Sequence, residues 1–288
     1  MNFRSKNLLV TGGAGFIGSN FIEHLFNKYN AINIYNLDLL TYAGNLENTH
    51  SFASHPNYTF IEGDICDELL LNNIFKKYQI DGIINFAAES HVDNSINHPD
   101  IFIRSNINGV LNLLKTSYSF WMDSPFKSKK EFNFARFHQV STDEVYGSID
   151  TGSFSEKSQY LPNSPYSASK ASADMLVRSY NKTFGLNTTI SISSNNYGKN
   201  QHKEKFIPKI IDSIIKNKDI VVYGNGLNIR NWIFVSDNCE AIDSIFNNSI
   251  SGKSYNVASQ NEFTNLELVN IIHAIINKKQ KVNKKIHF

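Results

Sequence analysis

A glycine-rich turn between a short apolar strand and a helix is the sequence feature that most restricts how this chain can fold. Residues 7–10 are apolar enough for a buried strand, residues 11–18 read Thr-Gly-Gly-Ala-Gly-Phe-Ile-Gly, and apolar residues at helical spacing follow. This order is the context that the dinucleotide-binding fingerprint requires. The glycines permit a tight turn close to a pyrophosphate, and the N-terminus of the helix attracts phosphate. A glycine turn that holds no ligand is the alternative.

An acidic residue ends the next predicted strand. Residues 31–37 are largely apolar and lead to Asp38, which stands 20 residues after Gly18. A carboxylate at this place can accept hydrogen bonds from the ribose hydroxyls of adenosine, whereas it repels a 2′-phosphate. We therefore expect NAD rather than NADP as the cofactor.

Strands and helices alternate through residues 1–194. Further strands are expected at residues 58–61, 80–86, 137–140 and 188–193, with helices between them, one of which spans residues 99–119. This alternation predicts an α/β protein with a doubly wound parallel sheet, whose ligands bind at the carboxyl ends of the strands. The polar stretch 123–131 is typical of a surface loop.

The pattern changes after residue 194. Short strands, turns and helices near residues 207–216 and 266–277 replace the regular alternation. We expect residues 1–194 to form a cofactor-binding domain that also carries the catalytic residues. Residues 195–288 should form a small α/β part that does not fold alone, caps the ligand edge of the sheet and binds the substrate.

Composition excludes several classes of partner. The formal net charge of +2 over 288 residues is too small to indicate nucleic acid or an anionic membrane surface. A basic run at residues 278–285 is typical of a solvated face. The two cysteines, Cys66 and Cys239, lie far apart without metal-ligand spacing, and neither a signal peptide nor a spanning segment is recognisable. We expect a cytoplasmic protein without a metal site.

A tyrosine and a lysine four residues apart are candidates for acid–base chemistry. Ser164 suits a helix N-cap and Pro165 the first helical position. Tyr166 and Lys170 should therefore share one face of a helix that ends at Gly185. A neighbouring ammonium favours the phenolate form of a tyrosine, whose pKa is ordinarily about 10. Such a pair can remove a proton from a substrate hydroxyl, although Tyr-x-x-x-Lys also occurs in helices by chance.

Three polar residues, Thr142, Asp143 and Glu144, follow the strand predicted at residues 137–140. Adjacent residues of a strand point to opposite faces. Both carboxyl groups can therefore reach one ligand only if the chain leaves strand geometry after Thr142, which the nearby Gly147 makes possible. The three residues would then form one constellation with the tyrosine–lysine pair. A solvated acidic turn is the alternative.

Small and polar residues after two other strands are candidates for cofactor contacts. Asp64 and Ile65 could flank an adenine, and Ala87 and Ala88 would let a cofactor lie against the backbone. His91 is interpreted as a hydrogen-bonded structural histidine rather than as an acid or a base.

Three polar residues of the C-terminal part could bind a substrate. Lys205, Arg230 and Asn261 are able to hold phosphates and a sugar, because ammonium, guanidinium and amide groups hydrogen-bond to such oxygens. Each of them could equally be an ordinary surface residue.

Ordered segments along nearly the whole chain carry a resemblance to a known family. They are residues 11–20, 38–46, 63–65, 87–93, 141–147, 164–172, 194–198 and 229–232. In these segments the chain resembles the extended short-chain dehydrogenase/reductases and, within them, the dTDP-glucose 4,6-dehydratase-like nucleotide-sugar dehydratases. The glycine motif and Tyr-x-x-x-Lys mark the superfamily. Thr-Asp-Glu after the strand separates hexose dehydratases from epimerases and decarboxylases.

The resemblance implies a role for each catalytic candidate. Tyr166 would remove the proton of the sugar 4-hydroxyl while hydride leaves C4 for NAD, with Lys170 lowering the pKa of the phenol and binding the nicotinamide ribose. Thr142 would hydrogen-bond to the same sugar oxygen. Glu144 would then take the C5 proton and Asp143 would protonate the departing 6-hydroxyl, before the hydride returns to C6. The two carboxyl groups need different pKa values for these roles.

The resemblance also implies two sets of binding residues. The residues expected to contact NAD are Gly12, Gly15, Phe16, Ile17, Gly18, Asp38, Leu39, Thr41, Asp64, Ile65, Phe86, Ala87, Ala88, Ser90, Ser105, Tyr166, Lys170 and Asn196. The residues expected to contact the nucleotide sugar are Ser90, His91, Thr142, Asn195, Lys205, Phe206, Val221, Tyr223, Arg230 and Asn261.

The chain departs from the family pattern at three places. Asn231 stands where relatives have Asp in Arg-Asp-Trp, and residues 198–202 lack the usual proline-rich form. Relatives complete the nucleotide pocket with a stretch that would follow Phe288, so we expect the pocket to be incomplete in residues 195–288. These departures leave open which base and which hexose the chain recognises.

The sequence thus predicts an NAD-dependent dehydratase that converts a nucleotide hexose to a 4-keto-6-deoxy sugar for surface glycans. A homodimer is expected, because relatives pair through helices that include the one bearing Tyr166. A nucleotide-sugar 4-epimerase, which would use Tyr166 and NAD but leave Asp143 and Glu144 idle, is one alternative. A non-catalytic NAD-binding protein is the other.

Overall fold

A parallel sheet forms the centre of the molecule. The computed structural model describes residues 3–222 and 224–280. In this part of the chain a seven-stranded sheet has the order β11-β8-β7-β4-β1-β2-β3, and all of its neighbouring strands are parallel. Its strands are β1 (Asn7–Thr11), β2 (Asn33–Asp38), β3 (Tyr58–Glu62), β4 (Gly82–Asn85), β7 (Arg136–Thr142), β8 (Thr188–Ser193) and β11 (Lys253–Val257). The strand order reverses between β1 and β4, which is where ligands of such sheets bind.

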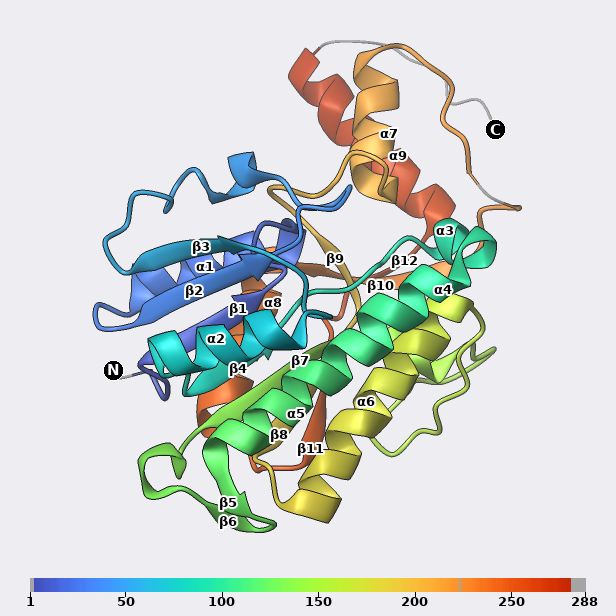
Figure 1. Ribbon diagram of the computed structural model, residues 1–288. Coiled ribbons are helices and arrows are strands. Elements are labelled where there is room, and N and C mark those ends of the chain that lie inside the picture. The colour runs from blue at the N-terminus through green and yellow to red at the C-terminus, as the bar shows by residue number, and fades with distance from the viewer. Residues whose placement is uncertain (1–2, 223, 281–288) are drawn as a thin grey trace.

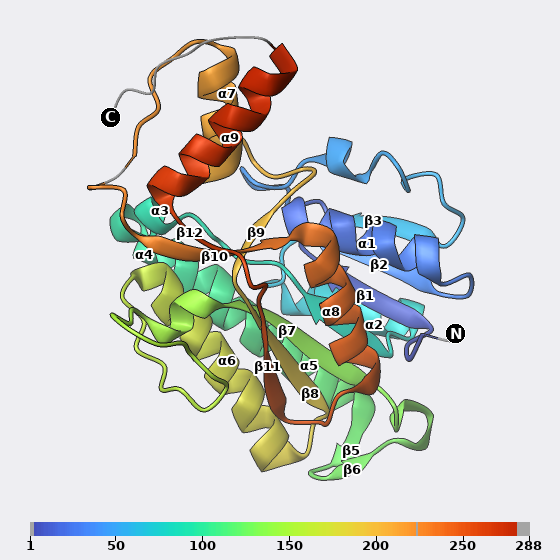
Figure 2. The same ribbon diagram turned by 180° about the vertical axis from the view of Figure 1, so that it is seen from behind.

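Helices cover both faces of this sheet (Figures 1 and 2). One apolar cluster joins α2 (Glu68–Tyr78), α5 (Gly109–Trp121) and α6 (Pro165–Phe184) to one face, and a second joins α1 (Phe16–Lys28) and α8 (Val235–Asn248) to the other. Successive strand residues serve opposite clusters, since Leu9 packs in the first and Leu8 in the second. Strands that bury both faces read as continuous apolar runs. The predicted doubly wound fold is confirmed.

A smaller layer stands beside the carboxyl ends of the strands. It contains a three-stranded sheet of order β12-β10-β9, formed by β9 (Asn195–Tyr197), β10 (Ile229–Phe234) and β12 (Glu262–Thr264). Helices α7 (Phe206–Ile215) and α9 (Asn265–Gln280) lie side by side in both views and share a separate apolar cluster with Trp232. Two elements later than residue 195 pack elsewhere: α8 lies against α1, and β11 pairs with β8 in the main sheet. The boundary at residue 195 stays a prediction.

Short elements fill the connections. They are η1 (Leu46–Thr49), α3 (Val92–Asn97), α4 (Pro99–Phe102), the π-helix η2 (Ile103–Asn108), β5 (Met122–Ser124), β6 (Lys127–Ser128), η3 (Lys130–Phe132) and η4 (Asp143–Tyr146). The helix expected over residues 99–119 is therefore divided into α4, η2 and α5. The stretch 123–131, predicted to be a loop, carries the antiparallel pair β5–β6.

Local sequence sets both ends of helix α6 as predicted. Ser164 is the N-cap and accepts a hydrogen bond from the Ser167 backbone N–H, while the Ser167 side chain accepts one from the Ser164 N–H. Pro165 occupies the first helical turn. Gly185 ends the helix with φ +71°, a left-handed conformation that glycine adopts without strain. This helix delivers the tyrosine–lysine pair to the sheet edge.

A buried carboxylate joins α8 to α1, the helix that follows the glycine turn. Asp243 of α8 accepts hydrogen bonds from Lys28 Nζ at 2.6 Å and Tyr29 Oη at 3.0 Å, and its Oδ2 lies 3.0 Å from His24 Nε2. Burial alone would raise the pKa of Asp243, but the hydrogen bonds from His24, Lys28 and Tyr29 outweigh it and hold this pKa below its usual value. These contacts hold the C-terminal half of α1 against α8.

We expect Asp243→Ala to lower the free energy of unfolding at pH 7 by about 2–4 kcal/mol, because it leaves buried donors without an acceptor. The contribution of a carboxyl with a depressed pKa is present above the unfolded-state pKa and is lost as pH falls through the folded-state value. The difference between variant and wild type in urea unfolding should therefore shrink below about pH 4. Glu240→Ala, on the exposed side of α8, is the control and should change stability by less than about 0.5 kcal/mol. A pH-independent difference would contradict this account.

Candidate active site

The main cavity opens at the carboxyl ends of β1, β4, β7 and β8. It has a volume of about 450 Å³ and is lined by the glycine turn, the ends of these strands, the start of α6 and residues of the smaller layer. All of the residues predicted to contact the cofactor line it. Their individual roles remain predictions, but the sequence reasoning selected one contiguous surface.

The glycine turn has the geometry of a phosphate cradle. Gly12 has φ +72°, and a Cβ there would lie 2.6 Å from the Ala87 backbone nitrogen. A Cβ on Gly18 would collide with the Gly12 carbonyl oxygen. Helix α1 begins after Gly15 without a side-chain cap, so its first backbone N–H groups are available to an anion. These features fit the pyrophosphate of a dinucleotide.

Asp38 lies at the end of β2 and lines the cavity, as predicted. Its carboxylate is 8% exposed and accepts hydrogen bonds from the backbone N–H of Ala14 and of Leu40, each at 2.9 Å. Burial raises the pKa of Asp38, and these two hydrogen bonds oppose the rise. A carboxylate has about four lone-pair directions. Asp38 therefore joins the glycine turn to β2 and keeps acceptor capacity for ribose hydroxyls.

Asp64 and Ile65, the two residues predicted to flank an adenine, follow β3 and line the cavity. Asp64 accepts a hydrogen bond from Arg104 at 2.5 Å and from the Cys66 backbone N–H at 2.8 Å. Ile65 packs against Gly109, and a Cβ on residue 109 would collide with the Ile65 side chain. Arg104 had not been predicted. Its position 40 residues further along the chain, in the π-helix η2, gave no sequence signal.

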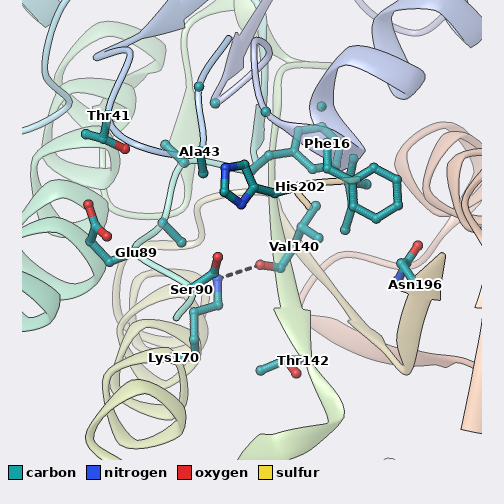
Figure 3. A pocket seen from close by; sticks show the side chains of 18 of the residues that line it. Phe16, Thr41, Ala43, Glu89, Ser90, Val140, Thr142, Lys170, Asn196 and His202 are labelled. Atoms are coloured by element: carbon teal, nitrogen blue, oxygen red, sulfur yellow. Dashed lines mark hydrogen bonds between the residues drawn. The ribbon is translucent and has the colours of Figure 1, made fainter. Parts of the chain in front are cut away.

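Tyr166 and Lys170 lie on one face of α6 and both line the cavity. They are 9% and 4% exposed. Figure 3 shows Lys170 among the lining side chains. Lys170 Nζ donates a hydrogen bond to the Val140 carbonyl oxygen at 2.7 Å. Burial raises the pKa of Tyr166, the charge of Glu144 raises it further, and a hydrogen bond with Thr142 acts in the opposite direction. The pKa of Tyr166 is thus raised because desolvation dominates, and Lys170 donates its hydrogen bond to the strand; the lowering of this pKa by Lys170 stays a prediction.

The chain leaves strand geometry after Thr142, as predicted. Strand β7 ends there and the short 3₁₀-helix η4 begins with Asp143 and Glu144. Thr142 Oγ1 accepts from the Glu144 N–H and donates to an Asp143 carboxylate oxygen, both at 3.4 Å. Gly147, with φ +83°, ends the turn. Both acids are thus brought to the region of Tyr166, since their charges act on its pKa.

The two carboxyl groups differ in their electrostatic surroundings. Burial and the charge of Glu144 raise the pKa of Asp143 to about 6, against the charge of Arg230. Glu144 is accessible, but the surface it exposes faces the cavity, and burial within the cleft raises its pKa against the charges of Arg230 and Lys205. Asp143 is therefore mainly protonated only below about pH 6 and keeps a minor protonated fraction near neutral pH, whereas two cations favour ionised Glu144.

The smaller layer supplies a group of residues that closes the cavity from the other side. Lys205 Nζ donates to the Ser90 carbonyl oxygen at 3.1 Å, and burial lowers the pKa of Lys205. Glu204 lies 3.8 Å from His91 and 3.5 Å from His202. In Figure 3 the imidazole of His202 is seen among the lining side chains, between Phe16 and Ala43. Glu204 and His202 had not been predicted, although the neighbouring Lys205 had.

The remaining predicted substrate residues have mixed positions. Asn195 and Phe206 line the cavity, whereas Val221, Arg230 and Asn261 do not and are exposed. Tyr223 lies outside the described residues. Arg230 nevertheless acts on the site through its charge, as the pKa directions of both acids show.

Two further residues have structural hydrogen bonds. His91 caps α3 by accepting from the Asn94 N–H at 3.3 Å, as a structural histidine would, and it is not among the residues that line the cavity. Its predicted contact with the nucleotide sugar stays a prediction. Asn231 donates to the Ser259 carbonyl oxygen at 2.7 Å and accepts from the Ser259 N–H at 3.1 Å. An amide can serve both groups and an ionised carboxylate only one. The Ser259 backbone therefore satisfies both hydrogen-bonding groups of Asn231, the residue at which this chain departs from Arg-Asp-Trp.

The described residues contain neither a candidate metal cluster nor a membrane-spanning helix. Within residues 3–222 and 224–280, no group of three or more His, Cys, Asp or Glu side chains could hold a metal ion. Over the same residues, no helix is long and apolar enough to cross a membrane.

Comparisons with known proteins agree with this geometry. The family model for GDP-mannose 4,6 dehydratase matches residues 9–287. The chain is 44% identical over 273 residues to the dTDP-glucose 4,6-dehydratase of Neisseria gonorrhoeae, covering 94% of this chain and 78% of that protein.

Solved structures give the same result. The dTDP-glucose 4,6-dehydratase of Bacillus anthracis, crystallised with NAD, matches with a TM-score of 0.83 and 41% identity over 98% of this chain and 85% of that one. The corresponding enzyme of Streptomyces venezuelae matches with a TM-score of 0.87 and 38% identity over 98% and 85%. The UDP-glucose 4-epimerase of Thermotoga maritima, at 24% identity and a TM-score of 0.83, shares the fold. The chain therefore belongs to the GDP-mannose 4,6 dehydratase family of extended short-chain dehydrogenase/reductases.

Proposed function

We propose that this protein is an NAD-dependent nucleotide-sugar 4,6-dehydratase whose substrate is dTDP-glucose or a closely related nucleotide hexose. The observation that carries the proposal is the pair Asp143 and Glu144, which η4 brings close enough to Tyr166 for both charges to act on its pKa; Glu144 itself lines the cavity. An oxidoreductase of this fold needs only the tyrosine, and the two acids add the means to remove water. Two relatives that the chain resembles are named dTDP-glucose 4,6-dehydratase.

The cavity residues fit NAD. Gly12, Gly15 and the first N–H groups of α1 would hold the pyrophosphate, and Asp38 would accept from the adenosine ribose. Asn196, whose buried Oδ1 has no hydrogen-bond partner among the described residues, would meet the nicotinamide end. When bound, NAD would accept a hydride from C4 of the sugar and return it at C6, and its positively charged ring would favour the phenolate of Tyr166.

Tyr166 removes the proton from the sugar 4-hydroxyl. Thr142 hydrogen-bonds to the phenol and can shift to the sugar oxygen, since its hydroxyl both donates and accepts. Lys170, held by the Val140 carbonyl, stabilises negative charge on the phenol oxygen while it remains an ammonium. The ketone formed at C4 makes the C5 proton acidic.

Glu144 and Asp143 then expel the 6-hydroxyl. Glu144, whose ionised form Arg230 and Lys205 favour against burial, takes the C5 proton. Asp143, whose pKa is raised to about 6, gives its proton to the departing oxygen. A water molecule leaves. When the hydride is returned to C6, Glu144 would give its proton back to C5, and the proton that Tyr166 took from the 4-hydroxyl would restore Asp143 through solvent. The positively charged Arg230 and Lys205 also suit the diphosphate of the nucleotide.

Replacing the proposed base separates this function from its alternatives. With dTDP-glucose as substrate, we expect wild-type protein to form a product lighter by one water, and Glu144→Gln to form it roughly 10²- to 10⁴-fold more slowly. Mass spectrometry of the nucleotide sugars measures this, and UDP-glucose is offered in parallel. Glu240→Gln is a matched control and should behave as wild type. A stereoisomer of unchanged mass would indicate a 4-epimerase. Bound NAD without turnover of any nucleotide hexose would indicate a binding protein.

The proposed acid gives turnover a defined pH dependence. Because the pKa of Asp143 is raised to about 6, its protonated form is present below that pH and is lost as pH rises through it. We expect kcat to fall on the alkaline side with an apparent pKa that belongs to the Asp143–Glu144 pair. Asp143→Asn should lower kcat by about 10²- to 10⁴-fold and remove this alkaline decline. An unchanged alkaline limb in the variant would assign the acid to another group.

We infer that the protein is a homodimer that acts in the cytoplasm and supplies deoxysugars for surface glycans. Large apolar side chains are exposed on α6 and on two elements that pack against it: Met175 of α6 is 45% exposed, Ile96 of α3 65% and Ile103 of η2 52%. Such a patch on a folded chain favours association with another protein surface. Cys66 and Cys239 are both free thiols, which favours a reducing compartment.

Charge on this patch should weaken the dimer. We expect Met175→Glu to shift the protein from dimer to monomer in analytical ultracentrifugation, because an unpaired carboxylate in an apolar interface is costly. Leu69, which is 78% exposed on α2, provides the control, since Leu69→Glu should leave the sedimentation coefficient unchanged. A wild-type protein that sediments as a monomer would contradict the dimer.

A further inference from the structure

A second buried carboxylate lies beside the catalytic residues and has no role in the reaction described above. Asp174 of α6 stands two helical turns after Tyr166 and one after Lys170, and it is 1% exposed. Its Oδ2 accepts hydrogen bonds from Ser141 Oγ at 2.6 Å and from Tyr160 Oη at 3.2 Å. Its Oδ1 accepts none from the described residues. A carboxylate buried this deeply is stable as an anion only if a positive charge compensates it.

Lys170 is the charge that compensates it. The ammonium of Lys170 donates to a neutral acceptor, the Val140 carbonyl, so this hydrogen bond provides no opposite charge. Burial lowers the pKa of Lys170, and the negative charge of Asp174 opposes this. In turn, burial raises the pKa of Asp174 to about 6, and Lys170 is the strongest opposing influence. Each group therefore favours the charged form of the other.

Other titratable groups near Asp174 do not supply a positive charge of this kind. Tyr160, from the segment before α6, and Tyr146, from η4, face it with phenol groups whose pKa values are raised. Arg178, one turn further along α6, acts on Tyr160 but is not among the influences on Asp174. The pair Lys170–Asp174 is thus a buried charge pair that interacts through space along one helical face.

We propose that Asp174 is a positioning residue of the reaction: its carboxylate keeps Lys170 in the ammonium form and, through Ser141, fixes the end of β7. Ser141 precedes Thr142, so the same carboxylate holds the strand end from which η4 starts. Asp174 would then determine both the charge of the Lys170 ammonium near Tyr166 and the position at which η4, with its two acids, begins.

The charge matters because the tyrosine and the lysine share protons. Removing one proton from the pair leaves either a phenolate beside an ammonium or a phenol beside a neutral amine, and both forms hold the same number of protons. Only the first form is a base for a sugar hydroxyl. A negative charge at Asp174 favours the ammonium and therefore the active form. The inference rests on the proposed dehydratase function, since it assigns a purpose to that base.

A structural role would give a different result, because hydrogen bonding and charge can be separated. Asp174→Asn keeps an oxygen that can accept from Ser141 and Tyr160 but removes the negative charge. The double variant Ser141→Ala/Tyr160→Phe keeps the carboxylate but removes the two donors that favour its ionised form. Ser172→Ala, on the exposed side of α6, is the matched control.

The direct measurement is the titration of Lys170. In protein labelled with ¹³C at lysine Cε, the Lys170 resonance is assigned by its loss in Lys170→Arg and followed against pH by NMR. We expect the pKa of Lys170 to fall by roughly one unit or more in Asp174→Asn, by less in the double variant, and not at all in Ser172→Ala. This readout does not depend on turnover, so it decides the inference even if no nucleotide hexose is converted.

The kinetic measurement uses the holoenzyme. We expect the plateau kcat of Asp174→Asn to fall by about 10- to 100-fold, with KM for the nucleotide hexose and bound NAD unchanged. The acidic limb of its kcat profile should move to lower pH, because the Tyr166–Lys170 pair then loses its first proton more easily. The plateau falls because less of the singly deprotonated pair is in the phenolate–ammonium form. Loss of packing alone would instead lower the thermal midpoint and raise KM.

An unchanged Lys170 titration in Asp174→Asn would overturn the proposal, as would an unchanged kcat. If Asp174→Asn does not fold, the double variant decides in the same way, since an unmoved Lys170 pKa in it would equally overturn the proposal. Failure of the dehydratase function is recognised separately, by absence of water loss in the wild-type protein.

Discussion

The contact between helix α6 and the end of strand β7 is the constraint on which the catalytic arrangement depends. Lys170 donates to the Val140 carbonyl, and Asp174 accepts from the Ser141 hydroxyl, so two consecutive residues of the strand are joined to two consecutive turns of the helix. Both groups are buried, and buried charges without partners are costly. Because this contact is specific, Tyr166 has a fixed position relative to the acids that follow the strand.

The cleft disfavours isolated charge of either sign, and this property explains how several groups can exchange protons there. Burial raises the pKa of Asp143, Glu144 and Tyr166 and lowers that of Lys170 and Lys205. The pKa values of the two carboxyl groups and of the two lysines are thereby brought closer to one another, whereas that of Tyr166 rises away from both. Proton transfer between groups of similar pKa has a small free-energy cost, which suits a reaction with several proton movements and no net change in the enzyme.

Much of the fold could be predicted from local patterns. The order of strand, glycine turn and helix, the alternation up to residue 194 and the caps of α6 at Ser164 and Gly185 all follow from short-range periodicity and backbone preference. The return of β11 to the main sheet could not be predicted in this way. Its pairing with β8 joins segments about sixty residues apart, and no local signal encodes such a partner.

The sequence by itself determined which residues could do chemistry: the glycine turn with Asp38, the tyrosine–lysine pair on one helical face, and the two acids after a strand. Tertiary structure alone decided their electrostatic state. The pKa of Tyr166 is raised rather than lowered, and Asn231 pairs with the Ser259 backbone instead of marking an altered pocket. The reason is physical: residue spacing is set by the local geometry of helix and strand, whereas desolvation and charge compensation depend on distant segments that pack around each group.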